Sequence, residues 1–400
     1  MIMAFPTRSQ LFSKLSIEQQ ILLAVCSIAG SEWRGEADAL LEKSFSWDQL
    51  ILLSDRHRML PLLYRNLKDD FRGVIIPPIL KEKYAVQTQQ TLKLAAEAVR
   101  ISNLLTSVGV QNIILKGPFL GQQLYGDLAL RPSRDIDILV SANSIDAFES
   151  FFTRDGYRLI NVDFELSPKQ KAYYFKHKNQ VAYRHQETGI MVELHWRLFS
   201  QRSLFPVSTE QAFAERDELI IAGRSISVLS KEHNFEFLCL HGAIHQWFRL
   251  RWLRDISQLV ESNNFSVEAV MRNALKNGNE LPVAQALVLS NIFFGSKELT
   301  CKVSDEYAIT WLVDQAIKAA INDESYTCSR KVTRLRVPIY KMKLKRGFRH
   351  KVESWKILNP NFSDWRRIAL PDCLFFLYFI LRPFLWFYEV YIARSNRKPK

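Results

Sequence analysis

The sequence predicts a mixed α/β (α+β) fold, with a small mixed β-sheet in the middle of the chain and helical regions on its N-terminal and C-terminal sides. Residues 109–230 contain short β-branched runs, whereas the flanking regions carry apolar side chains at helical spacing. The 400 residues, 48% of them hydrophobic, are enough for a sizeable core. We expect four parts: an N-terminal helical region (1–108), the core with the sheet (109–230), a helical domain (231–330) and a basic, aromatic C-terminal tail (331–400).

Helices should fill the N-terminal region. Ser16 and Gln19 have the spacing of a capping box at a helix start. Residues 46–67 predict one or two further helices, and we expect Arg56-His57 on a solvated face of them. Residues 78–108 predict one long helix, because proline occupies its first turn and a glycine follows its end.

Two acidic residues mark the central strand of the core. Asp135 and Asp137 alternate with isoleucines in DIDILV, so both carboxylates lie on one face of a strand. Two carboxylates about 4 Å apart repel each other by about 4 kcal/mol at an effective dielectric constant of about 20. A hard divalent cation with oxygen ligands relieves this repulsion. The pair therefore predicts a site for Mg²⁺ or Mn²⁺.

A turn upstream of this strand is suited to bind phosphate. Residues 111–115 predict a short strand that ends at Lys116-Gly117-Pro118, and residues 119–125 predict a helix. Backbone N–H groups at such a turn and helix start bind phosphate, and Lys116 adds a positive charge. Arg131 is a second candidate for a polyphosphate. Two alternatives stay open: Lys116 as a solvated lysine, and Arg131 as a structural partner that holds its loop to Asp135.

A third carboxylate comes from a later strand. In IMVELHW, residues 190–196, Glu193 shares one strand face with His195. A phosphate-binding turn, an Asp-x-Asp strand and a later acidic strand are the minimal set for two-metal nucleotidyl transfer. We expect His195 to support this site or to pack beside it rather than to bind the metal, because magnesium prefers oxygen ligands.

The segments LKGPFLGQQLYGDLALRPSRDIDILV and VELHWRLF resemble the uncharacterised nucleotidyltransferase family of the polymerase-β-like superfamily. Members carry an LKG turn, an R-P-x-x-D-x-D strand and a later D/E-L-H-W strand, and weaker similarity extends over residues 47–257. The resemblance implies a nucleotidyltransferase fold, with Asp135, Asp137 and Glu193 as metal ligands and ATP or another nucleoside triphosphate as donor. One difference is that Pro118 follows Gly117, where the superfamily usually has Gly or Ser.

Other elements follow in the core. A helix is expected over residues 144–154. Strands are expected over residues 157–162, 181–185, 191–196 and 225–229.

Two histidines in the helical domain are candidates for a second metal site. His241 and His245 lie one helical turn apart, a spacing that can bind zinc. No third ligand completes the pattern, so we favour buried histidines that dock their helix on the sheet, with substrate contact by His241 as an intermediate alternative. Asp255 matches a position of the family to which we assign no role.

The basic excess of the chain lies at its C-terminal end. Residues 331–400 hold 17 Lys and Arg against 4 Asp and Glu, so the other 330 residues are electrically balanced. The aromatic segment 373–392 is long enough to span a bilayer, but Arg382 and Glu389 each cost about 2.5–3.5 kcal/mol at its centre. An interfacial helix pair beside an anionic leaflet fits better. The alternative is a C-terminal helix packed on the preceding helices.

Location and partners follow from these patterns. The five cysteines form no close pair and no signal peptide is recognisable, so we expect a reduced, cytoplasmic protein, peripheral on the inner membrane face through residues 331–400. The absence of a nucleic-acid-binding motif argues against DNA or RNA.

Together, the residues predict a magnesium-dependent nucleotidyltransferase. Asp135, Asp137 and Glu193 would bind the metals, while Lys116, Gly117 and Arg131 would hold the polyphosphate. The acceptor is unidentified; a glycan or lipid precursor would suit the membrane contact. The alternative is a non-catalytic nucleotide- or membrane-binding protein on the same fold, against which the intact carboxylate set argues.

Overall fold

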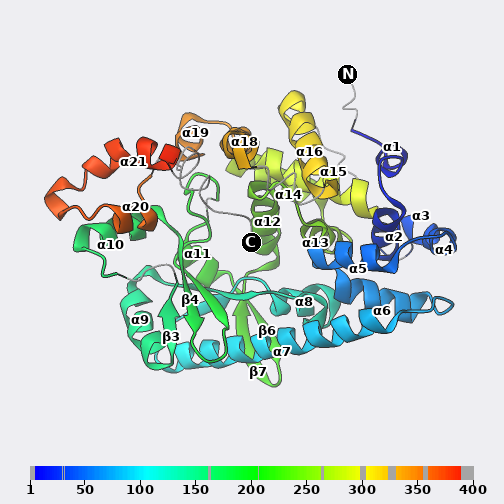
Figure 1. Ribbon diagram of the computed structural model, residues 1–400, viewed down its shortest axis with the longest axis horizontal. Coiled ribbons are helices and arrows are strands. Elements are labelled where there is room, and N and C mark those ends of the chain that lie inside the picture. Colours follow the sequence, from blue (N-terminus) through cyan, green and yellow to red (C-terminus); the bar gives the residue numbers. More distant parts are fainter. Residues whose placement is uncertain are drawn as a thin grey trace.

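The computed structural model has one mixed seven-stranded sheet surrounded by helices, which confirms the α/β (α+β) prediction (Figure 1). The structure describes residues 5–28, 30, 32–160, 164–205, 207–262, 265–297, 303–322, 330–354 and 359–388. The strands are β1 (Asn112–Ile114), β2 (Asp135–Val140), β3 (Tyr157–Leu159), β4 (Gln180–His185), β5 (Met191–His195), β6 (Asp217–Ile221) and β7 (Arg224–Val228).

The helices before and within the core are α1 (Arg8–Phe12), α2 (Ile17–Val25), α3 (Glu32–Gly35), α4 (Ala37–Leu41), α5 (Trp47–Arg56), α6 (Leu60–Asp70), α7 (Pro78–Ser107), α8 (Pro118–Tyr125), α9 (Ile145–Arg154), α10 (Pro168–His177) and α11 (Thr209–Ala214). Those after it are α12 (Lys231–Ile244), α13 (Leu250–Val260), α14 (Val267–Asn277), α15 (Glu280–Phe294), α16 (Glu306–Ile321), α18 (Arg330–Lys343), α19 (Phe348–Ser354), α20 (Phe362–Arg367) and α21 (Leu377–Phe387). Among the described residues, no helix is both long and apolar enough to cross a membrane.

The strand order β3-β4-β5-β2-β1-β7-β6 places the two acidic strands side by side at the centre. β2 pairs with β5 in parallel and with β1 in antiparallel orientation. β6 is a strand that the sequence does not reveal, because Asp217 and Glu218 open it with two charged side chains. Residues 161–163, the end of the strand expected to reach Val162, lie outside the described part of the chain.

Helices cover both faces of the sheet. Ile136, Ile138 and Val140 of β2 face a cluster that includes Leu94 and Ala98 of α7. Between them, Leu139 points to the opposite face, where the N-terminal helices and α12–α16 form the larger core. Because side chains alternate along a strand, Asp135 and Asp137 lie on the same face as Leu139. The acidic pair is therefore directed toward the helical domain rather than toward α7.

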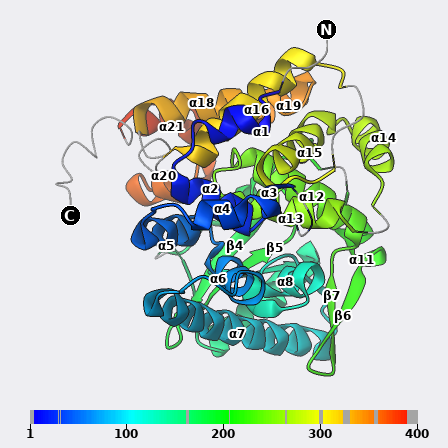
Figure 2. The ribbon, with the colours of Figure 1, turned by 90° about the vertical axis from the view of Figure 1, so that its right-hand side faces the viewer.

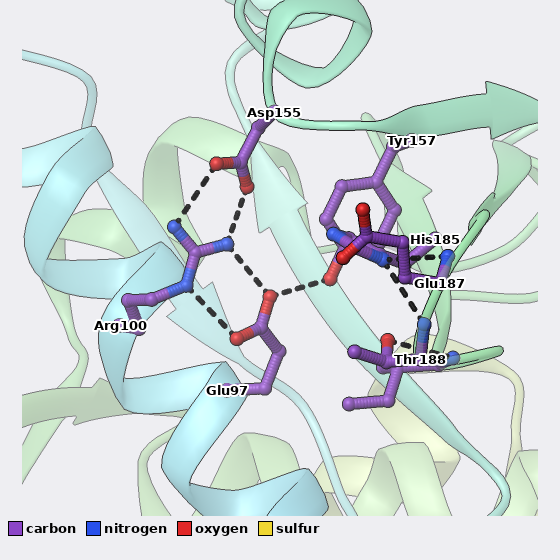
Figure 3. A network of polar contacts seen from close by, with 8 residues as sticks. Glu97, Arg100, Asp155, Tyr157, His185, Glu187 and Thr188 are labelled. Carbon is purple, nitrogen blue, oxygen red and sulfur yellow. Dashed lines mark hydrogen bonds and ion pairs between the residues drawn. The ribbon is translucent and has the colours of Figure 1, made fainter.

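The long helix α7 runs along one edge of the molecule in both views (Figures 1 and 2). A polar network fixes it to the sheet (Figure 3). Glu97 accepts a hydrogen bond of 2.6 Å from the hydroxyl of Tyr157, and Arg100 bridges Glu97 and Asp155. Hydrogen bonds from Arg100 and Tyr157 outweigh the effect of burial and lower the pKa of Glu97. The network therefore ties α7 to β3 through a charged carboxylate.

Helices make up most of the described C-terminal region. Tyr340 of α18 is buried and bonds Gln285 of α15, while α20 and α21 pack on α10 around Trp365, Phe375 and Tyr378. These side chains pack the described helices of residues 331–400 on other parts of the molecule. The membrane contact expected of this region stays a prediction. The last residues of the aromatic segment, 389–392, lie outside the described residues, as do Cys301 and Cys328. Cys26, Cys239 and Cys373 carry free thiols.

Candidate functional site

The two central strands bring their acidic residues together. In the parallel pairing of β2 with β5, Asp137 lies opposite Glu193, and Leu139 lies opposite His195. Both strands therefore present carboxylates to the same face of the sheet at the same level. Asp137, Glu193 and His195 each offer a ligand atom within 4.8 Å of the others, so the three could hold one metal ion.

Asp137 is the centre of this group. Its side chain is 2% exposed, and its Oδ1 atom lies 3.1 Å from Lys116 Nζ and 3.0 Å from His195 Nε2. Burial alone would raise the pKa of Asp137, but Lys116 and His195 outweigh that effect and hold the pKa well below its usual value. Asp137 is therefore a charged carboxylate at neutral pH.

His195 connects the carboxylates of the two strands. Its Nε2 atom also lies 3.7 Å from Glu193 Oε2, and Nδ1 lies 3.4 Å from the side-chain nitrogen of Asn179. Burial lowers the pKa of His195, yet hydrogen bonds with Asp137 and Glu193 raise it above its usual value. The ring therefore orients the Asp137 carboxylate through the hydrogen bond at Nε2, and it lies beside the Glu193 carboxylate.

Asp135 is the third carboxylate on this face. Ser133 Oγ donates a hydrogen bond of 2.9 Å to Asp135 Oδ1. Burial, then the charges of Asp137 and Glu193, raise the pKa of Asp135, while Lys116 partly opposes them. Three carboxylates with mutual repulsion and one lysine form an electrostatic environment that favours a further cation.

The Lys116–Pro118 turn leads from β1 into α8. Gly117 has φ of +71°, a conformation that favours glycine, and α8 begins directly after it at Pro118. The turn thus places Lys116 beside Asp137, rather than in solvent as the alternative expected.

Arg131 is buried and bound to protein groups. Its Nε atom donates to Asp255 Oδ2 across 2.9 Å, and Nη1 donates to the carbonyl of Gly117 across 3.3 Å. Tyr125 donates a second hydrogen bond, of 2.8 Å, to Asp255. The sequence left open that Arg131 holds its loop to Asp135. Arg131 is indeed a structural partner, but it binds Asp255 of α13 instead of Asp135. Asp255, left without a role by the sequence, joins α13 to the Lys116–Pro118 turn.

Arg58, which sequence reasoning missed, lies at the turn between α5 and α6. Its backbone has φ of +57°, and its carbonyl accepts a hydrogen bond of 2.7 Å from Arg251. Burial and the charge of Arg249 lower the pKa of Arg58 to about 10, whereas Asp135 acts to raise it. The Arg58 side chain therefore lies within electrostatic reach of the carboxylate site.

His57, beside Arg58, corrects another expectation. It is 1% exposed, not on a solvated face, and its Nδ1 atom accepts a hydrogen bond of 3.2 Å from the backbone of Leu250. Its pKa falls to about 3, first because of burial and then because of Arg56 and Arg249. The neutral ring holds the α5–α6 turn against the start of α13.

The rings of His241 and His245 lie side by side near the end of α12, tilted by 55° with centroids 4.8 Å apart, and the Trp252 ring lies within 5.5 Å of both. Burial and the charge of Lys116 lower the pKa of His241. Burial, Lys341 and Lys116 lower that of His245 to about 4. In the described part of the chain, neither belongs to a group of three metal-binding side chains.

A family model described as uncharacterised nucleotidyltransferase matches residues 43–295, which include the whole carboxylate site. The chain belongs to this family. Among solved structures, this nucleotidyltransferase family member is similar to an antigenic nucleotidyltransferase-like protein from Paracoccidioides brasiliensis, with 13% sequence identity and a TM-score of 0.30. The match covers 52% of this chain and 95% of that chain. No curated protein matches.

Proposed function

We propose that this protein transfers a nucleoside monophosphate from a nucleoside triphosphate, with ATP as the expected donor, to an acceptor, and releases pyrophosphate. The observation that carries the proposal is the pairing of Asp137 with Glu193 across adjacent parallel strands, with Asp135 on the same face. Membership of a nucleotidyltransferase family supports it.

The donor set fits a divalent cation. Asp135, Asp137 and Glu193 supply carboxylate oxygens, which are the ligands that Mg²⁺ and Mn²⁺ prefer. When bound, such an ion would neutralise the polyphosphate and lower the pKa of the acceptor hydroxyl. His195 would keep Asp137 and Glu193 oriented toward the metal, since it lies between them.

Basic groups around the carboxylates would bind the polyphosphate. Lys116 lies beside Asp137 and would place its charge between that carboxylate and the donor. Arg58 would contribute a second charge, because a strained backbone on an arginine near Asp135 is typical of a functional position. Arg131 would hold the Gly117 carbonyl, and thereby the turn, rather than touch the phosphates.

A second candidate function is nucleotide binding without catalysis. Lys116 and His195 already pair with Asp137, which balances its charge without a metal ion. A protein that only binds nucleotide would use the same basic groups but transfer nothing.

Two donors labelled at different phosphates separate these possibilities. Purified protein, Mg²⁺ and a cell extract that supplies acceptors are incubated with ATP labelled at the α-phosphate or at the γ-phosphate. Nucleotidyl transfer moves only the α-label to an acceptor. Transfer of the γ-label would instead indicate phosphoryl transfer. Binding without transfer of either label would favour the second candidate.

A further inference from the structure

Exposed apolar side chains form a stripe along α21. Phe376, Phe379, Ile380, Phe384 and Phe387 are 46–71% exposed and follow one another at helical spacing, so they share one side of the helix. We call these five residues the outer face of α21. Between Cys373 and Tyr388 the only charged side chain is Arg382, and it is buried on the other side of the helix.

Bonds on the inner side fix this orientation. Arg382 Nη1 lies 2.6 Å from Asp364 Oδ1 of α20, and both side chains are buried. The Tyr378 hydroxyl donates to the carbonyl of Ile368 across 2.6 Å and accepts from the N–H of Leu370 across 3.0 Å. Rotation of α21 to bury its outer face would break this buried ion pair, which is costly. The outer face therefore stays directed away from the core.

Cations and further apolar side chains lie on other helices of the C-terminal region. On α19, Phe348 is 84% exposed and Val352 is 56% exposed. Arg349 and Lys351, which lie between them in the sequence, are also exposed. Both views show α18, α19 and α21 toward the same upper side of the molecule (Figures 1 and 2). At the end of α20, the guanidinium of Arg367 lies 5.4 Å from the ring centroid of Tyr388. Aromatic and basic side chains thus occur together in this region.

We propose that the outer face of α21 binds the surface of an anionic lipid bilayer, with Phe348 and Val352 of α19 as additional contacts. Aromatic and aliphatic side chains enter the boundary between headgroups and acyl chains, while nearby Lys and Arg contact anionic headgroups. The chain lies on the bilayer and does not cross it. A second copy of the chain is a less suitable occupant, because it would bring two basic regions of the same sign together.

Vesicle co-sedimentation of the full chain tests this proposal. The lipids are pure phosphatidylcholine or phosphatidylcholine mixed with phosphatidylglycerol. The test variant is Phe376→Ser/Ile380→Ser/Phe384→Ser. The matched control is Ile75→Ser/Ile220→Ser/Leu275→Ser, which removes three apolar side chains that are 60–90% exposed elsewhere. Circular dichroism and the melting temperature of each variant establish that it is folded.

The wild type and the control should bind the anionic vesicles at least about tenfold more than the neutral ones, and the α21 variant should lose that binding. Equal binding by the α21 variant and the wild type would overturn the proposal, as would equal binding to both lipid mixtures. Light scattering measures the oligomeric state as a further outcome. If the wild type is a dimer that does not bind vesicles, and the α21 variant is a monomer, the outer face of α21 binds a second copy of the chain instead. None of these results depends on transferase activity.

Discussion

Arg131 and Asp255 form a buried ion pair, 2.9 Å from Nε to Oδ2, between the loop before β2 and helix α13. Arg131 is 6% exposed and Asp255 is fully buried. The same arginine bonds the Gly117 carbonyl, so one contact connects the helical domain to the turn beside the carboxylates. The position of that turn therefore depends on a residue more than a hundred positions away in the sequence.

Removal of the Asp255 charge should destabilise the protein. Asp255→Asn leaves Arg131 as a buried cation without a counter-ion, and we expect the free energy of unfolding to fall by about 3 kcal/mol. Tyr125→Phe removes only one neutral partner of Asp255 and should cost about 1 kcal/mol. Urea unfolding of both variants measures the difference. Equal costs for the two changes would mean that the ion pair is not the important contact.

Gly121 permits the close approach of α8 to the Arg131 loop. A Cβ atom at this position would lie 2.8 Å from Arg131 Cβ and 3.1 Å from the Asp127 carbonyl oxygen. Gly121→Ala should therefore cost about 1–3 kcal/mol through overpacking. Gly73→Ala, where an added Cβ meets nothing within 4 Å, is the control. Thermal melting compares them, and an unchanged melting temperature in Gly121→Ala would show that the two elements separate easily.

The strained backbone of Arg58 predicts that Arg58→Gly stabilises the protein relative to Arg58→Ala, although both changes weaken ATP binding. Arg58→Gly should raise the free energy of unfolding by about 1 kcal/mol relative to Arg58→Ala, because only glycine adopts φ of +57° without strain. Both variants should weaken ATP binding about tenfold through the lost charge, and leave AMP binding nearly unchanged. Urea unfolding and nucleotide titration measure the two effects. Full ATP affinity in both variants would exclude Arg58 from the polyphosphate site.

The Glu97 network predicts a pH-dependent stability. Because the folded-state pKa of Glu97 is lowered, its contribution is present above its unfolded pKa of about 4.5 and is lost as the pH falls through the folded value. Glu97→Gln should cost about 1 kcal/mol at pH 7 and progressively less in acid. Glu82→Gln, on an exposed part of α7, is the control. Urea unfolding from pH 7 into the acid range should show that the difference in unfolding free energy between the wild type and Glu97→Gln becomes smaller. A constant difference would contradict the ionised network.

Local patterns predicted the acidic strand and two of the helices near it. The alternation in DIDILV marks β2, and the proline start of α7 and the glycine before α8 mark those helices. Periodicity and turn residues act within a few positions, so one sequence is enough to find them. The expected strand face also holds, because Asp135 and Asp137 lie opposite the isoleucines that face α7.

Long-range contacts were beyond such reasoning. No local pattern pairs Arg131 with Asp255, 124 positions apart, and only the folded chain brings them together. Arg58 had no signal other than its place in a helix break, since a positive φ on arginine cannot be read from the sequence. His57 was misassigned because a polar residue at a helix end is usually solvated, whereas here α13 covers it.

Titration calorimetry of ATP tests the central claim most directly. Wild type and Asp135→Asn/Asp137→Asn are each titrated with ATP, in the presence and in the absence of Mg²⁺, and the melting temperature of the variant establishes that it is folded. The proposed site predicts Mg²⁺-dependent binding by the wild type and at least about tenfold weaker binding by the variant. Equal affinity of both proteins, with or without Mg²⁺, would contradict the assignment of these carboxylates to a metal-nucleotide site.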